Sequence, residues 1–468
     1  MKPSEALSLL RVARPPAPHG ARRLARCYSI EDVAKVARRR LPLGSRAYLE
    51  TGAEDEYTLR RNRTAFDRFE FLPRQPRDVS HVDTSTTLLG PRVPLPVALS
   101  PVGAPRMFHH EGELAVARAA RHAGIPYGIS TLATTSVEDV AAQTGTPLWF
   151  QLYLWGDRSE MKEAIARAKA AGFAALLFSI DTTVRSKRER EKHTGLELPT
   201  PNLPPHTLFE GALHPDWAWH FLTSPTVSFP NIGPPDRRSL DKIAAMFDGT
   251  VSWEDLDWIR GLWDGPILAK GVMRPEEAIR AADAGLQGVI VSNHGGRQLD
   301  HLPATIDVLP DIVDAVGDRL EVLVDSGFRR GSDIAAALAL GARAVLVGRA
   351  HLYGLAAAGE AGVRHCIDIL AQELRMTMQL CGARSVAELD RGMIRHQQPP
   401  AGPPPPGRTA IRAQAPRRNW RPGPARSRPG PARLWRLRLL DSAAAAGRAA
   451  ALADVAAAGR ARDRKSVV

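Results

Sequence analysis

One run of residues combines a potential base with a potential anion-binding group: Ser292-Asn293-His294-Gly295-Gly296-Arg297-Gln298-Leu299-Asp300. His294 is a plausible general base because an imidazole titrates near neutral pH. Asp181, far upstream, can hold one tautomer of that ring and favour its protonated form. Arg297 and Arg188 can each present a planar fork to a carboxylate. These residue types suit a general base placed beside a clamp for a carboxylate.

A second group of residues suits a bound, phosphorylated, electron-accepting cofactor. Lys270 can neutralise charge that develops on an electron-accepting ring. Tyr48 and Tyr153 can hydrogen-bond a substrate hydroxyl or carboxylate. The candidates for holding a phosphate are Gly327, Arg329, Gly331, Gly348 and Arg349. With no metal-ligand pattern in the sequence, this inventory indicates redox chemistry on a bound cofactor.

Each of these residues also has an ordinary structural interpretation. A histidine next to two glycines is more often structural, and Asp181-Thr182-Thr183 alone is a turn. Lys270 before a glycine is equally compatible with a solvated strand end. The chain has no Gly-x-Gly-x-x-Gly nicotinamide fingerprint, no His-Glu-x-x-His zinc site and no Gly-x-Ser-x-Gly elbow. The chemistry therefore depends on these groups converging in space.

Alternating strand and helix patterns predict that convergence. Apolar strand-like runs occur at Leu95–Ser100, Tyr127–Ser130, Leu148–Tyr153, Ala174–Asp181, Ile267–Val272, Gly288–His294, Glu321–Asp325 and Ala344–Gly348. Helical patterns occur at Gly112–Ala123, Ser136–Gln143, Ser159–Ala171, Trp253–Trp263, Pro275–Ala284, Thr305–Val316 and Ser332–Leu340. Eight near-evenly spaced units favour an α/β fold of the (β/α)8 TIM-barrel type over an open doubly wound sheet. Polar residues at the strand ends then meet at one face.

The 468 residues divide into three composition regimes. Residues 1–28 are predicted to form a basic N-terminal arm, with a transit peptide as the alternative. Residues 29–396 carry the barrel pattern. Residues 397–468 are rich in Pro, Arg and Ala and are predicted to be disordered, as an added tail or a wrong-frame translation. This tail holds 15 Lys/Arg against 3 Asp/Glu, which leaves about +1 of the net charge of +13 for the rest of the chain. The body therefore suggests no nucleic-acid partner.

An insertion of about seventy residues separates the fourth strand from the helix at Trp253, and it is rich in proline and aromatic residues. Such an insertion predicts a lid, a partner surface or a membrane contact, with scaffold padding as the alternative. The cysteines Cys27, Cys366 and Cys381 show no metal-ligand spacing and favour a reducing compartment. No stretch approaches the ~20 apolar residues of a transmembrane helix.

The run around His294 resembles the signature of the FMN-dependent L-2-hydroxy-acid dehydrogenase/oxidase family. Similar segments follow in family order along residues 28–394: Gly52-Ala53-Glu54-Asp55-Glu56, His110-Glu111-Gly112-Glu113, Phe150-Gln151-Leu152-Tyr153, Leu268-Ala269-Lys270-Gly271-Val272, Ala337-Leu338-Ala339-Leu340-Gly341-Ala342 and Gly359-Glu360-Ala361-Gly362-Val363. The resemblance is closest to the bacterial L-lactate dehydrogenase branch, through Ser130-Thr131-Leu132-Ala133-Thr134 and Leu352-Tyr353-Gly354-Leu355. It implies an enzyme that uses FMN as its cofactor.

The resemblance also implies a role for each matching residue. His294 would take a proton from the substrate while a hydride, or the electron pair of a carbanion, reaches the flavin, and Asp181 would pair with His294. Arg188 and Arg297 would bind the substrate carboxylate, helped by Tyr48 and Tyr153. The residues expected around the flavin ring or ribityl chain are Pro101, Val102, Gly103, Ser130, Gln151, Ser179, Lys270 and Ser292. The ribityl and phosphate end would be held by Asp325, Gly327, Arg329, Gly348 and Arg349.

Two positions bear on the reaction. Gly103 stands where several oxidases of the family have alanine and so resembles the dehydrogenase and monooxygenase members. Leu132 replaces an aromatic position of glycolate oxidase and favours a lactate-sized substrate. We therefore expect oxidation of an L-2-hydroxy acid, most readily L-lactate to pyruvate, with electrons passed to a quinone or cytochrome. An oxygen-using oxidase or lactate monooxygenase is the alternative.

The expected partners follow from the same resemblance. They are a small 2-hydroxy acid, a quinone or cytochrome, and further copies of this chain in a homotetramer. The expected location is cytoplasmic, with a peripheral contact on the inner face of the plasma membrane as an option. A different class of function is binding of nucleic acid or anionic membrane through the basic tail at 397–468.

Overall fold

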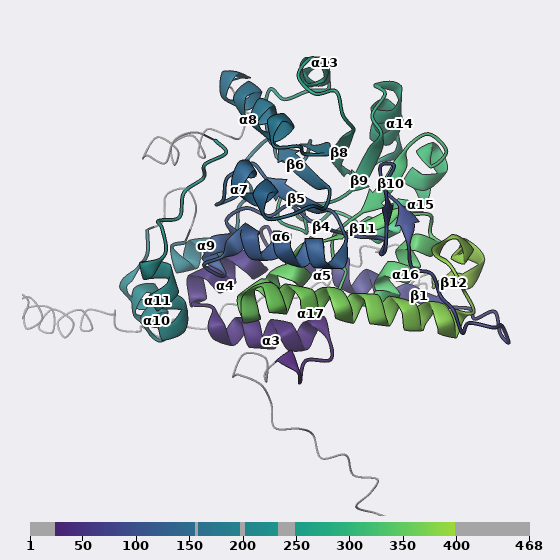
Figure 1. The fold of residues 1–468 in the computed structure, drawn as a ribbon, viewed down its shortest axis with the longest axis horizontal. Helices are drawn as coiled ribbons and strands as arrows, with labels where there is room; N and C mark the ends of the chain where they lie inside the picture. Colours follow the sequence, from purple (N-terminus) through teal and green to yellow (C-terminus); the bar gives the residue numbers. More distant parts are fainter. Residues whose placement is uncertain (1–23, 155–157, 197–201, 233–248, 398–468) are drawn as a thin grey trace, which may run out of the picture. The chain divides into compact units, whose positions relative to one another are not determined.

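The computed structural model describes residues 24–154, 158–196, 202–232 and 249–397. Its centre is a closed barrel of eight parallel strands (Figure 1), in the order β4-β5-β6-β7-β8-β9-β10-β11. The strands are β4 (Val97–Leu99), β5 (Tyr127–Ser130), β6 (Leu148–Leu152), β7 (Ala175–Ser179), β8 (Ile267–Val272), β9 (Gly288–Val291), β10 (Glu321–Val324) and β11 (Ala344–Val347). The predicted (β/α)8 barrel is confirmed, with its eight strands in the predicted order.

Seven helices follow the predicted pattern around the barrel. They are α6 (Gly112–Ala123), α7 (Val137–Ala142), α8 (Arg158–Ala170), α13 (Asp255–Arg260), α14 (Pro275–Asp283), α15 (Thr305–Val316) and α16 (Gly331–Ala339). α6 ends at Gly124, which has a φ of 66° and closes the helix in a left-handed conformation. Ser136 caps α7 by accepting a hydrogen bond from the backbone N–H of Asp139. Helix α13 is shorter than the predicted 253–263.

The barrel interior is a packed core, and a hairpin covers it at one end of the barrel. The inward-facing side chains are Ala98, Trp149, Ala175, Leu177, Leu268, Ile290, Leu323, Ala344 and Leu346. Leu88 and Val93, from the hairpin β2 (Thr86–Thr87) and β3 (Arg92–Val93), belong to the same cluster. The backbone N–H of Leu89 donates to Glu321 at the first residue of β10. This hairpin therefore covers the amino ends of the strands, and the carboxyl ends remain for a site.

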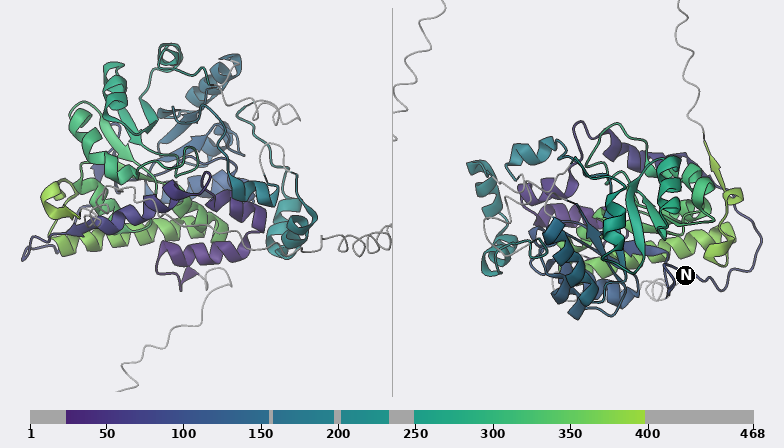
Figure 2. Two further views of the ribbon diagram at one scale, coloured as in Figure 1. Left: turned by 180° about the vertical axis from the view of Figure 1, so that it is seen from behind. Right: turned by 90° about the horizontal axis from the view of Figure 1, so that it is seen from above.

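Helices outside the repeat pack along the barrel. They are α3 (Ile30–Arg40), α4 (Leu43–Glu50), α5 (Tyr57–Thr64) and α17 (Arg349–Cys381), with the short turns η1 (Ala65–Arg68), η2 (Pro105–Met107), η3 (Val386–Glu388) and η4 (Arg391–Met393). Figures 1 and 2 show α3 lying along α17, and α17 also packs against α6. Strand β1 (Phe69–Phe71) pairs antiparallel with β12 (Ile394–His396) and so joins the two ends of the body.

Helix α17 is not one straight helix. Ala358 and Gly359 have non-helical φ/ψ values, and a side chain on Gly359 would touch the ring of His109. Across the bend, a Cβ placed on Gly354 would come within 2.4 Å of the carbonyl oxygen of Gly362. Only a glycine permits this backbone contact, which lets the two halves of α17 fold tightly on each other.

The insertion after β7 contains three described helices: α9 (Glu189–Thr194), α10 (Pro205–Ala212) and α11 (Pro215–Thr223). Helix α9 packs against α4, and α10 contacts both α4 and α11. Trp217 anchors α11 by donating its indole N–H to the carbonyl oxygen of Met107 at 3.1 Å. The insertion is therefore attached to the rim of the barrel beside α4.

The N-terminal arm at 1–28 and the tail at 397–468, both predicted from composition, lie mostly outside the described residues. Of the predicted N-terminal arm, residues 24–28 are described, and Leu24 and Cys27 are buried in the main core. The tail from 398 onward lies outside the described residues. No helix in the described part of the chain has the length and apolarity needed to cross a bilayer.

Candidate active site

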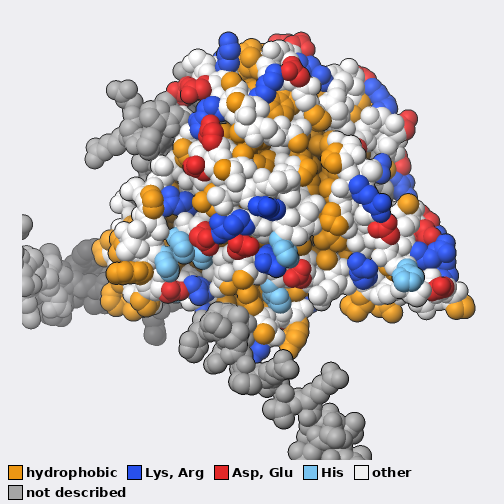
Figure 3. Space-filling view, in the orientation of Figure 1, with side chains coloured by type: hydrophobic (Ala, Val, Ile, Leu, Met, Phe, Trp, Pro, Cys, Tyr) orange, Lys and Arg blue, Asp and Glu red, His pale blue; other side chains and the backbone are white. Residues whose placement is uncertain are grey.

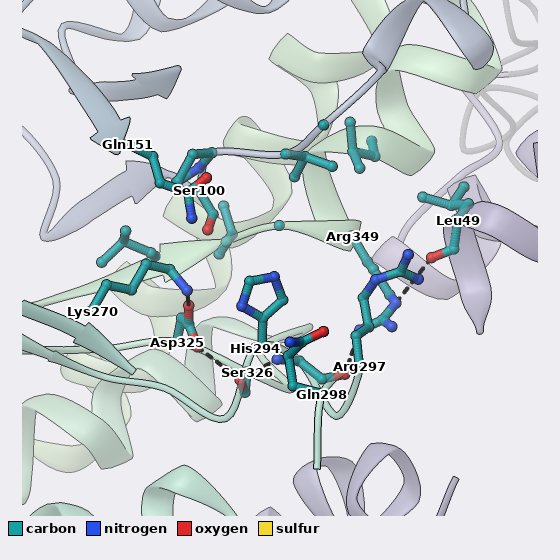
Figure 4. Close-up of a pocket in the computed structure, with 18 of the residues that line it drawn as sticks. Leu49, Ser100, Gln151, Lys270, His294, Arg297, Gln298, Asp325, Ser326 and Arg349 are labelled. Carbon is teal, nitrogen blue, oxygen red and sulfur yellow. Dashed lines mark hydrogen bonds and ion pairs between the residues drawn. The ribbon is translucent and has the colours of Figure 1, made fainter. Parts of the chain in front are cut away.

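A cavity lies at the carboxyl ends of the barrel strands, where the sequence predicts the site. Its volume is about 1240 Å³ when the space open to solvent is counted. The predicted residues that line it are Tyr48, Pro101, Val102, Gly103, Gln151, Tyr153, Arg188, Lys270, His294, Arg297, Asp325, Gly327, Arg329, Gly348 and Arg349. The barrel therefore gathers groups from almost every strand end into one space (Figure 4).

His294 lies in a turn after β9, and Asp181 lies just after β7. The predicted strand 288–294 in fact ends at Val291, because the backbone then turns through left-handed conformations. The φ values are 57° at His294, 68° at Gly295 and 73° at Gly296. This turn places the imidazole in the cavity, where Figure 4 shows it at the centre of the labelled residues.

The imidazole and the Asp181 carboxylate form a hydrogen-bonded pair. Nδ1 of His294 lies 3.1 Å from Oδ2 of Asp181 and 3.2 Å from Oδ1. Burial lowers the pKa of His294 below its ordinary value, although Asp181 acts in the opposite direction. Burial acts to raise the pKa of Asp181, but the charge that His294 carries when it is protonated, together with the hydrogen bond between the two groups, outweighs burial and holds that pKa low. The pair therefore presents a neutral imidazole held by an ionised carboxylate.

Gly271 makes room for this pair. It has a φ of 107°, and a Cβ at this position would lie 2.6 Å from Cβ of Asp181. A larger residue in β8 would therefore push Asp181 away from the imidazole, in addition to straining the backbone.

Arg188 and Arg297 lie next to each other at one side of the cavity. Arg188 donates from Nε to Oγ of Ser186 at 3.0 Å and from Nη2 to Oε1 of Gln298 at 2.9 Å. Arg297 donates from Nη1 to the carbonyl oxygens of Tyr48 and Thr51 at 2.8 and 3.0 Å. Burial and the neighbouring charge of Arg297 lower the pKa of Arg188 to about 10. Two half-buried guanidinium groups this close favour a bound anion.

The two predicted tyrosines border the same space. The guanidinium carbon of Arg297 lies 5.2 Å from the ring centroid of Tyr48, a cation–π distance. The ring of Tyr153 lies 6.4 Å from the His294 ring, measured between centroids. Burial raises the pKa of both phenols, so that both hydroxyl groups stay protonated. Protonated phenols in this position can donate hydrogen bonds to a substrate.

Lys270 lies on the barrel wall as a charged, fully paired group. Its Nζ donates to Oγ of Ser292 at 3.0 Å and lies 3.2 Å from Oδ2 of Asp325 (Figure 4). Burial acts to lower the pKa of Lys270, but the charges of Asp325 and Asp181 outweigh it and raise that pKa. The barrel therefore fixes a permanent positive charge at the cavity wall.

Gln151 offers an unsatisfied group to a ligand. Its Nε2 donates to Oγ of Ser179 at 2.8 Å, whereas its buried Oε1 has no hydrogen-bond partner among the described residues. Buried polar atoms are nearly always hydrogen-bonded in native proteins. A ligand that carries an N–H donor, such as the flavin ring of FMN, would satisfy this oxygen.

The other end of the cavity suits a phosphate. Helix α17 begins at Arg349, and a helix N-terminus attracts anions. The guanidinium of Arg349 donates to the carbonyl oxygens of Leu49, Gly295 and Thr51. It pairs with no carboxylate among the described residues, and burial together with Arg297 lowers its pKa to about 9.

Two glycines and a second arginine complete this end. Burial lowers the pKa of Arg329, the other guanidinium at this end of the cavity. A Cβ on Gly348 would have only Ser100 within 4 Å, so the backbone there faces open space. Gly327 has a φ of 94° and lies against the Asn62 carbonyl, which only glycine allows. Half-buried cations, a helix N-terminus and an open backbone fit the phosphate of FMN.

Four predicted site residues lie behind the cavity wall instead of lining it. These residues are Ser130, Ser179, Asp181 and Ser292. Ser130 accepts a hydrogen bond from the backbone N–H of Leu132, and Ser292 accepts one from that of His294. These side chains therefore fix the groups that face the cavity.

The sequence-based prediction missed several lining residues, namely Leu49, Ser100, Phe108, Thr182, Gly295, Gln298, Ser326, Phe328, Leu346, Val347 and Leu352. Gln298, Gly295 and Ser326 adjoin residues that were chosen, so their place in the sequence is a usable signal. Gln298 is the clearest omission, because it accepts from Arg188 and donates to the carbonyl oxygen of Asp181 at 3.2 Å. Leu49 and Phe108 come from outside the barrel repeat and carry no such signal.

Large apolar side chains are exposed on the insertion. They are Leu208, Phe209 and Leu213 from α10 and the turn after it, with Trp219, Phe221 and Leu222 from α11. Trp219 is 67% exposed and Leu222 is 80% exposed. Figure 3 shows hydrophobic side chains gathered over these two helices, next to histidine side chains. An exposed apolar patch of this kind marks an interaction surface.

The chain matches a family model described as FMN-dependent dehydrogenase over residues 37–396. It is 44% identical over 381 residues to an L-lactate dehydrogenase of Caulobacter vibrioides, an alignment that covers 80% of this chain and 99% of that protein. The crystal structure of the monotopic membrane protein (S)-mandelate dehydrogenase matches with a TM-score of 0.76 at 38% identity, covering 79% of this chain and 100% of that one. A mandelate oxidase bound to (S)-2-phenylpropionate matches with a TM-score of 0.67 at 39% identity, covering 79% and 98%.

Proposed function

Because the chain belongs to the FMN-dependent dehydrogenase family, we propose that it oxidises L-lactate to pyruvate and passes the electrons to a quinone or cytochrome. The family match and the names of the relatives support FMN-dependent 2-hydroxy-acid oxidation as the reaction class. The observation that carries the finer proposal is that His294, held from behind by Asp181, lines one cavity together with the half-buried guanidinium groups of Arg188 and Arg297.

The chain's own residues bind the substrate and move one proton. Arg188 and Arg297 bind the carboxylate, and the phenol groups of Tyr48 and Tyr153 donate hydrogen bonds to the substrate. With Nδ1 bonded to Asp181, Nε2 of His294 is the nitrogen left to accept the proton. That proton comes from the hydroxyl if the electrons leave as a hydride, and from Cα if they leave through a carbanion. Asp181 stabilises the imidazolium that forms.

FMN, when bound, accepts the two electrons that leave the substrate. Lys270 would hold the ring end of FMN through a fixed positive charge, and Gln151 through its free amide oxygen. Arg329, Arg349, Gly327 and Gly348 would hold the phosphate. This assignment accounts for three features that are costly without a ligand: the unpaired buried oxygen of Gln151 and the half-buried guanidinium groups of Arg329 and Arg349.

Leu132 and Gly103 support lactate as the substrate. A Cβ on Gly103 would lie 3.2 Å from Cβ of Leu132, so the two residues already pack against each other. Leu132 and Phe108 both line the cavity, and the ring of Phe108 stacks on that of Tyr48 at 6.0 Å between centroids, so they give this part of the cavity an apolar wall. We propose that this wall accommodates the methyl group of lactate more readily than it accommodates the larger phenyl group of mandelate.

The test is anaerobic reduction of the bound flavin by a panel of glycolate, L-lactate, longer 2-hydroxy acids and mandelate. L-lactate should bleach the yellow holoenzyme fastest, and D-lactate should leave it unchanged. A purified protein that does not bind FMN would refute the assignment. Faster bleaching by mandelate would keep the reaction class but overturn lactate as the substrate.

A second experiment separates the proposed acceptor from oxygen. The holoenzyme should reduce a quinone analogue or a cytochrome during L-lactate turnover and release little hydrogen peroxide under air. Stoichiometric peroxide would identify an oxidase, and acetate as the product would identify a monooxygenase. Gly103 motivates the choice, because a glycine there resembles the dehydrogenase and monooxygenase members.

We also propose peripheral association with a membrane through the exposed apolar side chains of α10 and α11. The patch extends over both helices, because Phe209 and Leu213 belong to α10 and the turn after it, and Trp219 and Leu222 belong to α11. The similar (S)-mandelate dehydrogenase is a monotopic membrane protein, which supports the same behaviour here. Contact with a bilayer would bring a membrane-dissolved quinone close to the enzyme.

The oligomeric state and a binding role for the tail are two further parts of the proposal. A homotetramer is expected from the family resemblance, and light scattering of the holoenzyme would test it. Binding of nucleic acid or anionic vesicles by the tail at 397–468 is the alternative function of another class, and a deletion of that segment would test it.

A further inference from the structure

A buried carboxylate lies beside the two arginines of the cavity. Glu191, on helix α9 of the insertion, is 2% exposed. Its Oε1 lies 3.0 Å from Nη2 of Arg297, and its Oε2 lies 3.9 Å from Nη1 of Arg188. Each of its carboxylate oxygens therefore faces a different guanidinium group. Among the described residues, these two arginines are the only charged groups that form ion pairs with Glu191.

The three charges form one unit inside the protein. Without Glu191, two positive charges would lie next to each other with little solvent between them. With Glu191, the unit has a net charge of +1. A substrate with one carboxylate then makes the assembly neutral, whereas a second carboxylate would leave an uncompensated negative charge in a buried site.

Glu191 also orients Arg297. The carbonyl oxygens of Tyr48 and Thr51 hold Nη1 of Arg297, and the Glu191 carboxylate holds Nη2. These bonds use both N–H groups of Nη1 and one of Nη2, so Nε–H and the second Nη2–H of Arg297 remain for a ligand and are oriented before it arrives. Preorganised donors bind an anion at a lower entropic cost.

We propose that Glu191 is a positioning and specificity-determining residue, which orients Arg297 and restricts the arginine pair to ligands that carry one carboxylate. The inference rests on the proposed binding of the substrate carboxylate by Arg188 and Arg297. It assigns to the insertion a direct part in substrate selection, because Glu191 belongs to α9 and not to the barrel.

The experiment compares the dissociation constants of acetate and malonate for the holoenzyme, measured from the change in flavin absorbance. Glu191→Gln keeps an oxygen that can accept from Arg297 but removes the charge. It should raise the affinity for malonate relative to acetate by about tenfold, since a unit charge is removed from a buried site. Glu191→Asp keeps the charge and should preserve the preference of the unmodified enzyme.

Controls separate a charge effect from a loss of structure. Glu189→Gln removes a carboxylate from the same helix, one that is exposed and paired with Lys187 at 2.6 Å, and should leave both constants unchanged. Glu191→Ala removes both the charge and the acceptor and should weaken acetate binding. An equal loss of both affinities in Glu191→Gln, or no change in either, would overturn the inference.

The proposed function has its own control in this design. Arg188→Gln and Arg297→Gln should each weaken binding of acetate and of malonate. If neither substitution weakens them, carboxylate binding by the arginine pair is wrong. If both weaken them while Glu191→Gln keeps the original preference, only the inference about Glu191 fails.

Discussion

Oδ2 of Asp181 lies 3.1 Å from Nδ1 of His294, although the two residues are separated by 113 positions in the chain. The pair exists because β7 and β9 both end at the carboxyl face of the barrel, on either side of β8. A carboxylate on Nδ1 fixes the tautomer and leaves Nε2 for a substrate. The consequences of this arrangement can be measured.

Asp181→Asn should reduce the rate of flavin reduction by about 100-fold or more, because an amide stabilises the imidazolium much less than a carboxylate does. Stopped-flow measurement with saturating L-lactate under anaerobic conditions gives the rate. Asp283→Asn, at an exposed aspartate paired with Arg319, is the matched control and should react normally. A normal rate in Asp181→Asn would contradict the proposed role of the pair.

The pH dependence of kcat/KM should follow the imidazole. Burial lowers the pKa of His294 below its ordinary value. The base therefore stays neutral at pH 7, and kcat/KM should fall only when the pH drops below the usual range for histidine. Asp181 raises the pKa of His294, so Asp181→Asn should shift the acid limb further toward low pH. A shift toward high pH would contradict this electrostatic coupling.

Arg188→Lys should raise KM for L-lactate by about 10- to 100-fold, because lysine cannot reproduce the fork that bonds Ser186 and Gln298 while facing the substrate. If the lost interaction is equal in the ground state and the transition state, kcat should change much less. Steady-state kinetics with a saturating electron acceptor measures both constants. Arg274→Lys, at an exposed site, is the control and should match the unmodified enzyme.

Lys270→Met should destabilise the protein by about 3–5 kcal/mol, because Asp325 would remain as a buried, unpaired charge. Urea unfolding would measure the loss. The double substitution Lys270→Met with Asp325→Leu should regain much of that stability but still bind FMN weakly. Recovery of FMN binding in the double variant would show that neither charge contributes to the cofactor site.

Replacing Leu208, Phe209, Trp219 and Leu222 together by serine should release the protein from sedimenting lipid vesicles. These side chains are exposed, so the substitutions should leave the flavin spectrum and the thermal unfolding midpoint nearly unchanged. Met376→Ser with Leu380→Ser removes two exposed apolar side chains from α17 and should sediment like the unmodified protein. Equal sedimentation of the two variants would place the membrane contact elsewhere.

Much of the barrel follows from short-range patterns. Apolar runs separated by amphipathic helices, several of them followed by glycine, indicate the β/α units, and the bounds of α6 and α15 agree with the predicted ranges. Because parallel strands share one carboxyl edge, polar residues at strand ends could be assigned to one site. The bend in α17 could not be predicted, because it depends on contact between Gly354 and Gly362.

Some contacts at the site could not be predicted from the sequence either, because they join segments far apart in the chain. Arg188 is the residue just before α9, and Glu191 lies three positions later in the first turn of that helix. The sequence carries no sign that Glu191 meets Arg297, since that contact joins the insertion to the turn after β9. Phe108, which follows η2, and Leu49, near the end of α4, reach the cavity from outside the repeat that predicted the other lining residues.

The left-handed turn at His294, Gly295 and Gly296 determines whether the histidine–aspartate pair can be transferred to another protein. A histidine and an aspartate placed on the equivalent strands of another barrel would not reproduce the pair unless the recipient loop adopted the same three positive φ values. For a residue other than glycine, such a conformation costs about 1–3 kcal/mol. An engineer who wishes to transplant the base must therefore move the loop as one piece, with the glycine in β8 that leaves room for the carboxylate.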